Sequence, residues 1–302
     1  MKRAIVLSGG GSKGAYEAGF LLAAKELNQH FDIVTGTSIG ALNGALVAMG
    51  DYEGLEYTWN ILDMDHVFNN APDLTDLKDD FMTTSLFNKE EGSNLSELKE
   101  SIAQQTSLAQ SFLKYYFKNK GADNTPFVEH CRGLMDEERL LSSPIDFGIC
   151  TVQFPSMKAC YKTKSEMERG HMLDYLLASS ACFPVFPMTE INGNKYIDGG
   201  FSDNLPIDLA LDMGADEIVV VDMHLIPVHP QYINRPSILY SCPPVDLGGF
   251  MDFNKDALER NKRLGYLMAY KLFGNYEGNQ YTFLPSNQTV FHDYYKQLLM
   301  ME

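Results

Sequence analysis

Apolar runs near the start of the chain are each followed by glycines and then by a helix-forming segment. Residues 2–7 read as a buried strand, residues 8–14 include four glycines, and residues 15–24 have a helical pattern. The same order recurs over residues 31–49. Two later apolar runs also read as strands, at residues 145–152 and 217–221. Strands that alternate with helices predict an α/β fold with a largely parallel sheet covered on both faces, and a functional site at the carboxyl ends of its strands.

The two remaining long regions, residues 51–144 and 226–302, do not show this order of strand, glycines and helix. Residues 51–144 form a polar insertion that we expect to be mainly helical, with turn-rich breaks. Residues 226–302 begin with a proline-punctuated segment, and residues 255–273 then predict a helix. This last region could be a lid, a cap that selects substrates or a dimer surface. The segments with candidate chemistry span most of the chain, so we expect residues 1–302 to form a single domain.

Ser38 is the first candidate for chemistry. It lies in Gly36-Thr37-Ser38-Ile39-Gly40, between an extended apolar stretch and a helix-forming run. This order is what a nucleophile elbow requires, because Gly36 and Gly40 relieve crowding in a tight turn that exposes one hydroxyl.

The glycine-rich segment 8–14 predicts an anion site at the start of a helix. Successive glycines there leave backbone N–H groups unpaired, with the positive end of the helix dipole behind them. The anion is either a bound phosphate or an oxyanion that forms during catalysis. The segment matches a dinucleotide fingerprint, but Asp32 comes at the start of the second strand and not at its end. A P-loop is disfavoured because Lys13 is followed by Gly14.

Asp198 is the candidate partner of Ser38. It ends a short predicted strand and precedes Gly199 and Gly200, which allow a sharp turn and close approach of another segment. A carboxylate in this position could receive the serine proton, although Asp-Gly also favours ordinary turns.

Four segments resemble, in order and type, the motif blocks of the patatin-like phospholipase family, at residues 9–14, 36–40, 178–187 and 198–206. The resemblance extends from about residue 3 to residue 222. It implies a three-layer α/β/α fold and a Ser-Asp dyad that hydrolyses lipid esters without histidine, metal or cofactor. By this resemblance, Ser38 is the nucleophile and Asp198 its base. Backbone N–H groups of the glycine loop form the oxyanion hole, at Gly9, Gly10 and Gly11.

The resemblance also implies supporting positions. Lys13 stands where many family members carry arginine, so we expect it to have a structural or electrostatic role. The small residues and the apolar stretch within residues 178–187 are expected to support the site or to contact an acyl chain.

A Ser-His-Asp triad is the main catalytic alternative. Asp222 and His224 follow the apolar run 217–221, which gives the order seen in α/β-hydrolases. Residues two apart in a strand point the same way, so we expect neither to orient the other and His224 to lie at the rim or surface.

Composition narrows the setting and the partners. The five cysteines have no regular spacing, which favours reduced thiols and a cytoplasmic location, with peripheral membrane contact left open. The apolar run near the first residue is too short for the core of a signal peptide. No apolar run in the sequence is long enough to span a bilayer. A formal net charge of −16 argues against nucleic acid and against long-range attraction to anionic lipid. Membrane contact must then be local, with residues 112–120 and 294–301 as candidates.

The sequence therefore predicts a serine acyl hydrolase acting on lipid esters such as phospholipids or lysophospholipids. A protein that binds a dinucleotide or phosphate ligand through the glycine loop, and a patatin-like scaffold with an inactive site, remain the alternatives. The oligomeric state is left open.

Overall fold

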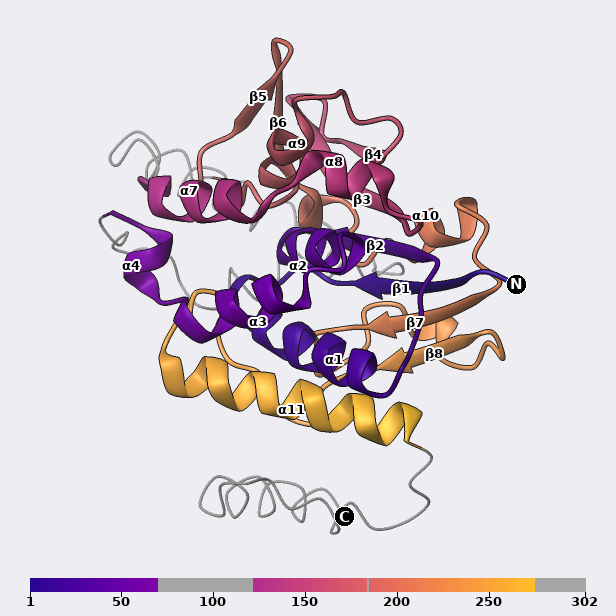
Figure 1. The fold of residues 1–302 in the computed structure, drawn as a ribbon. Coiled ribbons are helices and arrows are strands. Elements are labelled where there is room, and N and C mark those ends of the chain that lie inside the picture. The colour runs from indigo at the N-terminus through magenta and orange to yellow at the C-terminus, as the bar shows by residue number, and fades with distance from the viewer. Residues whose placement is uncertain (70–121, 184, 275–302) are drawn as a thin grey trace, which may run out of the picture.

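An eight-stranded mixed sheet forms the centre of the computed structural model, which describes residues 1–69, 122–183 and 185–274 (Figure 1). Strands β3, β2, β1, β7 and β8 are neighbours in that order and run parallel, whereas β4 and β6 pair antiparallel with β3, and β5 with β6. The strands are β1 (Arg3–Leu7), β2 (Ile33–Thr37), β3 (Asp146–Phe154), β4 (Lys158–Thr163), β5 (Thr189–Ile191), β6 (Asn194–Asp198), β7 (Glu217–Val221) and β8 (Ile238–Ser241).

Helices lie on both sides of this sheet (Figure 1). The α-helices in the described residues are α1 (Gly14–Glu26), α2 (Ile39–Ala48), α3 (Tyr52–Ile61), α4 (Met64–Val67), α7 (Thr125–Leu134), α8 (Glu137–Ser142), α9 (Met172–Ser179), α10 (Ile207–Asp212) and α11 (Lys255–Phe273). Three short 3₁₀ turns complete the set, η1 (Gly11–Lys13), η2 (Gly199–Phe201) and η3 (Pro230–Tyr232). The three-layer α/β/α expectation is therefore confirmed.

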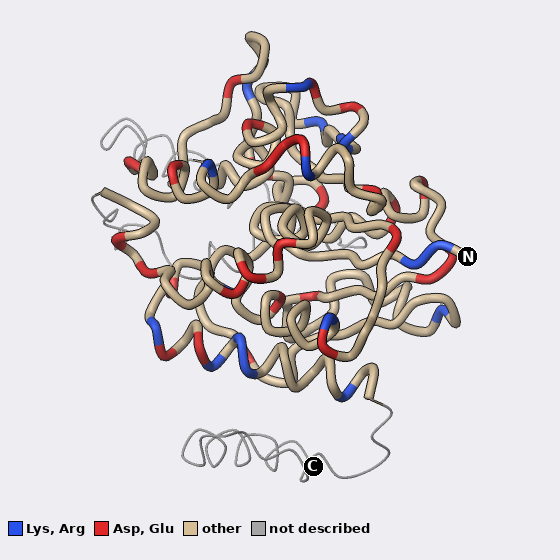
Figure 2. Tube along the Cα trace, viewed as in Figure 1, with Lys and Arg blue, Asp and Glu red and all other residues tan. Residues whose placement is uncertain are grey.

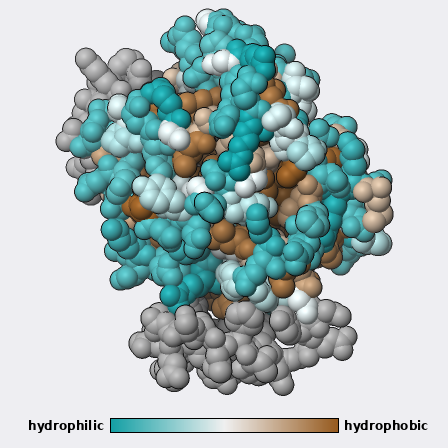
Figure 3. Space-filling view, in the orientation of Figure 1, coloured by the Kyte–Doolittle hydropathy of each residue, from teal (hydrophilic) through white to brown (hydrophobic). Residues whose placement is uncertain are grey.

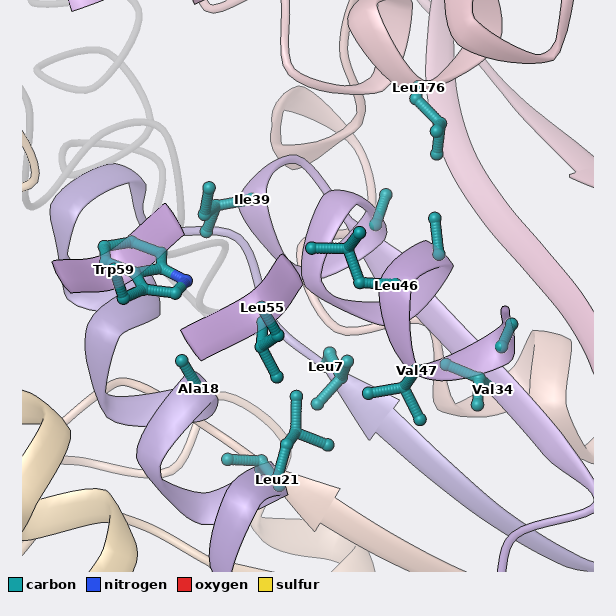
Figure 4. Close-up of a cluster of buried hydrophobic side chains, with 14 of the residues drawn as sticks. Leu7, Ala18, Leu21, Val34, Ile39, Leu46, Val47, Leu55, Trp59 and Leu176 are labelled. Atoms are coloured by element: carbon teal, nitrogen blue, oxygen red, sulfur yellow. The ribbon is translucent and has the colours of Figure 1, made fainter. Parts of the chain in front are cut away.

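The central strands are buried on both faces, and the alternation of side chains divides the core in two. In β1, Ile5 and Leu7 join a large cluster beneath α1, α2 and α9, while Ala4 and Val6 join a smaller cluster beneath α10. Figure 4 shows part of the large cluster, with Leu7 from the sheet packed among side chains of the covering helices.

The long strand β3 brings the carboxyl ends of β2 and β6 together. One edge of β3 pairs with β4 along residues 148–153. The other edge is shared, because Thr37 of β2 is opposite Cys150 and Asp198 of β6 is opposite Thr151. Strands β2 and β6 thus run toward each other along this edge, and their carboxyl ends meet.

The region after residue 226 supplies an edge strand, β8, and the outermost helix, α11. Helix α11 begins and ends where the sequence predicts, at Lys255 and Phe273. It packs closely on α1, since a Cβ at Gly19 would lie 1.7 Å from the carbonyl oxygen of Lys262, and one at Gly265 would lie 1.8 Å from that of Tyr16.

The part of the insertion that the structure describes is helical, with α3, α4, α7 and α8. The candidate membrane-contact segments, residues 112–120 and 294–301, lie outside the described residues. Acidic and basic residues are interspersed over the trace, with several basic residues along α11 (Figure 2). The face in Figure 3 is largely hydrophilic, with apolar residues in small separate areas. Within the described residues, no helix has both the length and the apolar character of a membrane span.

Candidate active site

Ser38 occupies a strained turn between β2 and α2. Its backbone has φ 56° and ψ −126°, a combination that a residue with a side chain rarely adopts and that is common at nucleophile elbows. The flanking glycines permit the turn, because a Cβ at Gly36 would lie 2.5 Å from the backbone of Gly40, and one at Gly40 would lie 2.5 Å from the carbonyl oxygen of Ser8. The predicted strand, tight turn and helix are therefore present.

The Ser38 hydroxyl donates a hydrogen bond to Asp198 Oδ2 at 2.7 Å. The two residues are 160 positions apart in the sequence, and the meeting of β2 and β6 beside β3 brings them together. The Ser38 N–H donates to Ser179 Oγ, whose own hydroxyl donates to the carbonyl oxygen of Cys150. Ser179 thus fixes the start of α2 against β3, a role that sequence reasoning missed although it quoted the surrounding motif.

Asp198 is only 5% exposed, and its carboxylate accepts two hydrogen bonds, from the Ser38 hydroxyl and from the Gly200 N–H. Burial raises the pKa of Asp198 to about 6, and the two hydrogen bonds partly oppose this shift. Gly199 is needed for the close packing here, since a Cβ would lie 2.2 Å from the carbonyl oxygen of Cys150. The carboxylate is therefore a stronger base than an aspartate in water.

The glycine loop lies beside Ser38, but the N–H groups of Gly9, Gly10 and Gly11 differ in their hydrogen bonds. The Gly9 N–H donates to the carbonyl oxygen of Asn204 at 3.0 Å, and the Asn204 side chain donates back to the carbonyl oxygen of Gly9. Among the described residues, the N–H groups of Gly10 and Gly11 have no such protein acceptor. The expected set of oxyanion donors therefore narrows to Gly10 and Gly11, because the Gly9 N–H is already engaged by the protein.

A segment from the C-terminal region holds this loop in place. The Ser12 N–H donates to the carbonyl oxygen of Phe250 at 2.7 Å, and the Ser12 hydroxyl donates to that of Gly249. Gly11 has φ 57°, and a Cβ there would lie 2.2 Å from the Phe250 oxygen. Sequence reasoning offered a lid, a cap or a dimer surface for the region that contains residues 249–253, but it did not expect this contact, which joins segments more than 200 residues apart.

Lys13 lies partly buried beside this loop. Burial lowers the pKa of Lys13, and the negative charges of Asp246 and Asp222 partly offset that effect. This environment is consistent with an electrostatic role, which the structure does not assign further.

Ser38 and Asp198 line the same pocket. Gly10 and Gly11 line one side of it. The rest of the wall is mainly apolar, and its members include Ile39, Leu42, Leu62, Val67, Phe127, Phe186, Phe250, Met251 and Phe253. Such a wall suits a hydrocarbon substrate with one polar reacting group.

The expectation for Asp222 and His224 is wrong in its geometry. His224 Nδ1 lies 2.6 Å from Asp222 Oδ1, and the His224 N–H donates to the same oxygen. The strand ends at Val221, so strand alternation does not govern the residues that follow. His224 is not among the residues that line the Ser38 pocket, and the hydroxyl and N–H of Ser38 donate to Asp198 and Ser179.

The structure also bears on ligand-binding alternatives. The Asp32 carboxylate accepts a hydrogen bond from the Arg3 N–H at the start of β2, at the end of the strand far from the glycine loop. This position does not suit the ribose contact of a dinucleotide site. Within the described residues, no three His, Cys, Asp or Glu side chains are grouped as metal ligands.

Comparisons with known proteins bear on the family and the fold. The sequence model described as patatin-like phospholipase matches residues 5–211. The chain is 22% identical to lysophospholipase NTE1 of Meyerozyma guilliermondii, over 91% of this chain and 19% of that protein. It is 26% identical to patatin-like phospholipase domain-containing protein 7 of Rattus norvegicus, over 73% of this chain and 13% of that protein. The chain thus spans about a fifth or less of the length of these relatives.

One solved structure supports the fold. The crystal structure of VipD from Legionella pneumophila superposes with a TM-score of 0.53 at 15% identity, covering 90% of this chain and 67% of that one.

Proposed function

Since the chain belongs to the patatin-like phospholipase family, we propose that it is a serine acyl hydrolase that cleaves carboxylic esters of lipids. Ser38 is the nucleophile and Asp198 the base in this proposal. The single observation that carries it is the 2.7 Å hydrogen bond from the Ser38 hydroxyl to a buried carboxylate, where both residues line an apolar pocket.

The first half of the reaction forms an acyl-enzyme. As Ser38 Oγ attacks the ester carbonyl carbon, its proton passes to Asp198 Oδ2. The carbonyl oxygen becomes an oxyanion, which the N–H groups of Gly10 and Gly11 stabilise. The ester bond then breaks, and the leaving alkoxide takes the proton from Asp198.

The second half repeats these steps with water. Asp198 takes a proton from water, the hydroxide attacks the acyl carbon, and Ser38 regains its proton as the fatty acid leaves. A pKa of about 6 suits both directions, because Asp198 is mostly ionised at pH 7 and still holds a proton better than an ordinary aspartate.

Lysophospholipids and phospholipids are the proposed substrates, and the chemistry uses no metal or cofactor. The apolar wall supports an acyl substrate, and the names of the curated relatives, lysophospholipase and patatin-like phospholipase, support these lipids for the first assay.

The test is Ser38→Ala, assayed on p-nitrophenyl acetate and on lysophosphatidylcholine. We expect turnover to fall by about 10³-fold or more on both, because no other group supplies the nucleophile. Labelling by a fluorophosphonate probe should disappear as well. The matched control is Ser241→Ala, which removes another buried serine that lies outside the pocket and should leave turnover within about twofold.

Two outcomes would reject the proposal. Near-normal turnover in Ser38→Ala would remove the nucleophile. A wild-type protein that neither hydrolyses esters nor reacts with the probe would instead be an inactive scaffold.

A further inference from the structure

The Gly10 N–H, one of the two proposed oxyanion donors, belongs to the peptide unit that joins Gly9 to Gly10. A trans peptide unit is planar, and its C=O and N–H point in opposite directions. A group that holds the Gly9 carbonyl oxygen therefore also sets the direction of the Gly10 N–H. Gly10 and Ser38 line the same pocket, so this direction decides whether the N–H can reach a carbonyl oxygen that Ser38 attacks.

Asn204 binds both backbone groups of Gly9. Its side-chain Nδ2 donates to the Gly9 carbonyl oxygen at 3.1 Å, and its main-chain carbonyl oxygen accepts from the Gly9 N–H at 3.0 Å. The two residues are 195 positions apart in the sequence. Asn204 is buried, and hydrogen bonds away from water are electrostatically stronger. The Gly9–Gly10 peptide is therefore held firmly by a distant segment.

The Asn204 side chain also lies beside the nucleophile. A Cβ at Gly9 would lie 2.3 Å from Asn204 Oδ1 and 3.1 Å from Ser38 Cβ, so Gly9 is packed between the two residues. Asn204 follows Asp198 by six residues. One segment of the chain thus supplies both the proposed base and the group that holds the glycine loop.

The side-chain oxygen of Asn204 shows that the amide does not serve stability alone. Asn204 Oδ1 is buried and has no hydrogen-bond partner within the described residues. Such an oxygen costs free energy, which an apolar side chain at the same place would avoid. Within those residues, the one side-chain hydrogen bond of Asn204 is the bond to Gly9. Local rules of this kind are broken most often at functional sites.

The other proposed donor, the Gly11 N–H, is held differently. It belongs to the Gly10–Gly11 peptide, whose carbonyl oxygen accepts from the Lys13 N–H at 3.2 Å. That bond comes from the backbone of the same loop, within the turn η1. Of the two peptides, Gly9–Gly10 depends on a side chain from elsewhere. A change at Asn204 should therefore disturb one donor and leave the other in place.

We propose that Asn204 is a positioning residue of the oxyanion hole, whose side-chain amide holds the Gly9 carbonyl oxygen so that the Gly10 N–H faces the oxyanion formed at Ser38. The inference rests on the proposed function and adds a residue outside the Ser-Asp dyad. Its effect belongs to the transition state, because the oxyanion carries more charge than the carbonyl oxygen of the bound ester.

The test variants are Asn204→Ala and Asn204→Leu, neither of which can donate to Gly9. The second keeps a side chain of similar length and serves if the first does not fold. The matched control is Thr35→Val. The Thr35 hydroxyl is fully buried and donates to the carbonyl oxygen of Pro206, so this control removes a similar bond to the same segment without touching Gly9. Circular dichroism and melting curves check that each variant is folded.

The first readout is the hydrolysis of p-nitrophenyl acetate. In both Asn204 variants kcat and kcat/KM should fall together by about 10²-fold, the lower end of the range for loss of one oxyanion donor. KM should stay within about threefold, because an interaction made only in the transition state does not change it. Thr35→Val should keep kcat within about threefold.

The second readout separates positioning from a general structural role. A decyl trifluoromethyl ketone adds to Ser38: Oγ bonds to the carbonyl carbon, the proton passes to Asp198, and the carbonyl oxygen becomes an oxyanion. Its Ki should rise in the Asn204 variants by about as much as kcat falls, since both depend on the same donor. The Ki of decyl methyl ketone, which remains largely unreacted, should not change. Equal weakening of both ketones would overturn the positioning role.

Two further results would overturn the inference and leave the proposed function intact. One is near-normal kcat in folded Asn204→Ala and Asn204→Leu. The other is an equal loss of kcat in Thr35→Val, because loosening of the segment would then explain the effect.

Crystal structures test the inference even if the protein hydrolyses no ester. The Gly9–Gly10 peptide should keep its orientation in the wild type and in Thr35→Val, and should rotate or lose a single orientation in Asn204→Ala. An unchanged peptide in Asn204→Ala would show that Asn204 does not set the direction of the Gly10 N–H.

Discussion

Two buried aspartates, Asp198 and Asp222, lie at the ends of strands in the same sheet, yet their surroundings differ. Asp222 is fully buried and accepts hydrogen bonds from the N–H groups of His224 and Val228 and from the Tyr240 hydroxyl, while His224 Nδ1 lies 2.6 Å from the same carboxylate.

Asp198, by contrast, has one backbone partner, Gly200, and one hydroxyl partner, Ser38. The Asp222 carboxylate contacts three groups of its own loop and the hydroxyl of Tyr240 in β8, so it fastens that loop to β8. The Asp198 carboxylate accepts from one hydroxyl in the lining of a pocket, and that hydroxyl can give up its proton to it. The comparison teaches that burial alone does not single out a candidate catalytic carboxylate, and that the hydrogen-bond partners and the adjoining space must be considered before one is proposed.

The largest expected effect is on turnover in Asp198→Asn. The amide keeps the shape and can accept from Gly200 and donate to Ser38, but it cannot take a proton. We expect kcat to fall by about 10³-fold, within the range for loss of a general base. The unfolding free energy should stay level or rise, because a pKa raised from 3.8 to about 6 makes the ionised carboxylate costly by up to about 3 kcal/mol. Denaturant unfolding measures the change in stability, and ester assays measure the change in kcat. Near-normal kcat in Asp198→Asn would show that Asp198 is not the base and that it does not differ from Asp222 in this respect.

Asp222→Ala should show the opposite pattern. It leaves two backbone N–H groups and the Tyr240 hydroxyl without their acceptor, so we expect the unfolding free energy to fall by about 3 kcal/mol. Below its melting temperature the variant should retain kcat within about tenfold. Asp212→Ala, which removes an exposed aspartate of α10, is the control and should change little. A folded Asp222→Ala protein with a 10³-fold loss of kcat would give Asp222 a catalytic role.

The pH dependence should follow Asp198. Its carboxylate must be ionised to accept the serine proton, so kcat/KM should fall about tenfold per pH unit below an apparent pKa near 6. Stability has the opposite sign, because a folded-state pKa above the unfolded value favours folding at low pH. That contribution is complete below about pH 4 and is lost as the pH rises through 6.

The excess stability of Asp198→Asn over wild type should therefore be near zero at pH 4 and reach its maximum by pH 7. Other titrating groups cancel in this difference. A difference that does not change with pH would show that the carboxylate of Asp198 is not held at a raised pKa.

Local patterns in the sequence predicted the elements around the site well. The first two strand, turn and helix units and the bounds of α11 follow from apolar periodicity and glycine placement. The contact of Ser38 with Asp198 was expected from the family resemblance, and no local pattern contains it. It depends on β2 and β6 each pairing with the same edge of β3, which brings together two residues 160 positions apart.

The features that sequence reasoning missed have the same cause. Two of them are backbone hydrogen bonds, from the Gly9 N–H to the carbonyl oxygen of Asn204 and from the Ser12 N–H to that of Phe250. Each joins distant segments through backbone atoms, which the pattern of side chains along the sequence does not reveal. The contact between Asp222 and His224 was missed because the strand ends at Val221, and element ends are the least certain part of a pattern.

The smallest expected effect is that of His224→Ala, which sharpens the comparison most. The substitution removes one partner of Asp222 and leaves three, so we expect a loss of stability of about 1 kcal/mol. Turnover and the rate of fluorophosphonate labelling should stay within about threefold, because Asp198 and not an imidazole takes the Ser38 proton in the proposed mechanism. A loss of 10²-fold or more in a folded protein would instead favour a triad of Ser38, Asp222 and His224. The Asp222 network would then be part of the catalytic machinery, and the hydrogen bond from Ser38 to Asp198 would have a structural role.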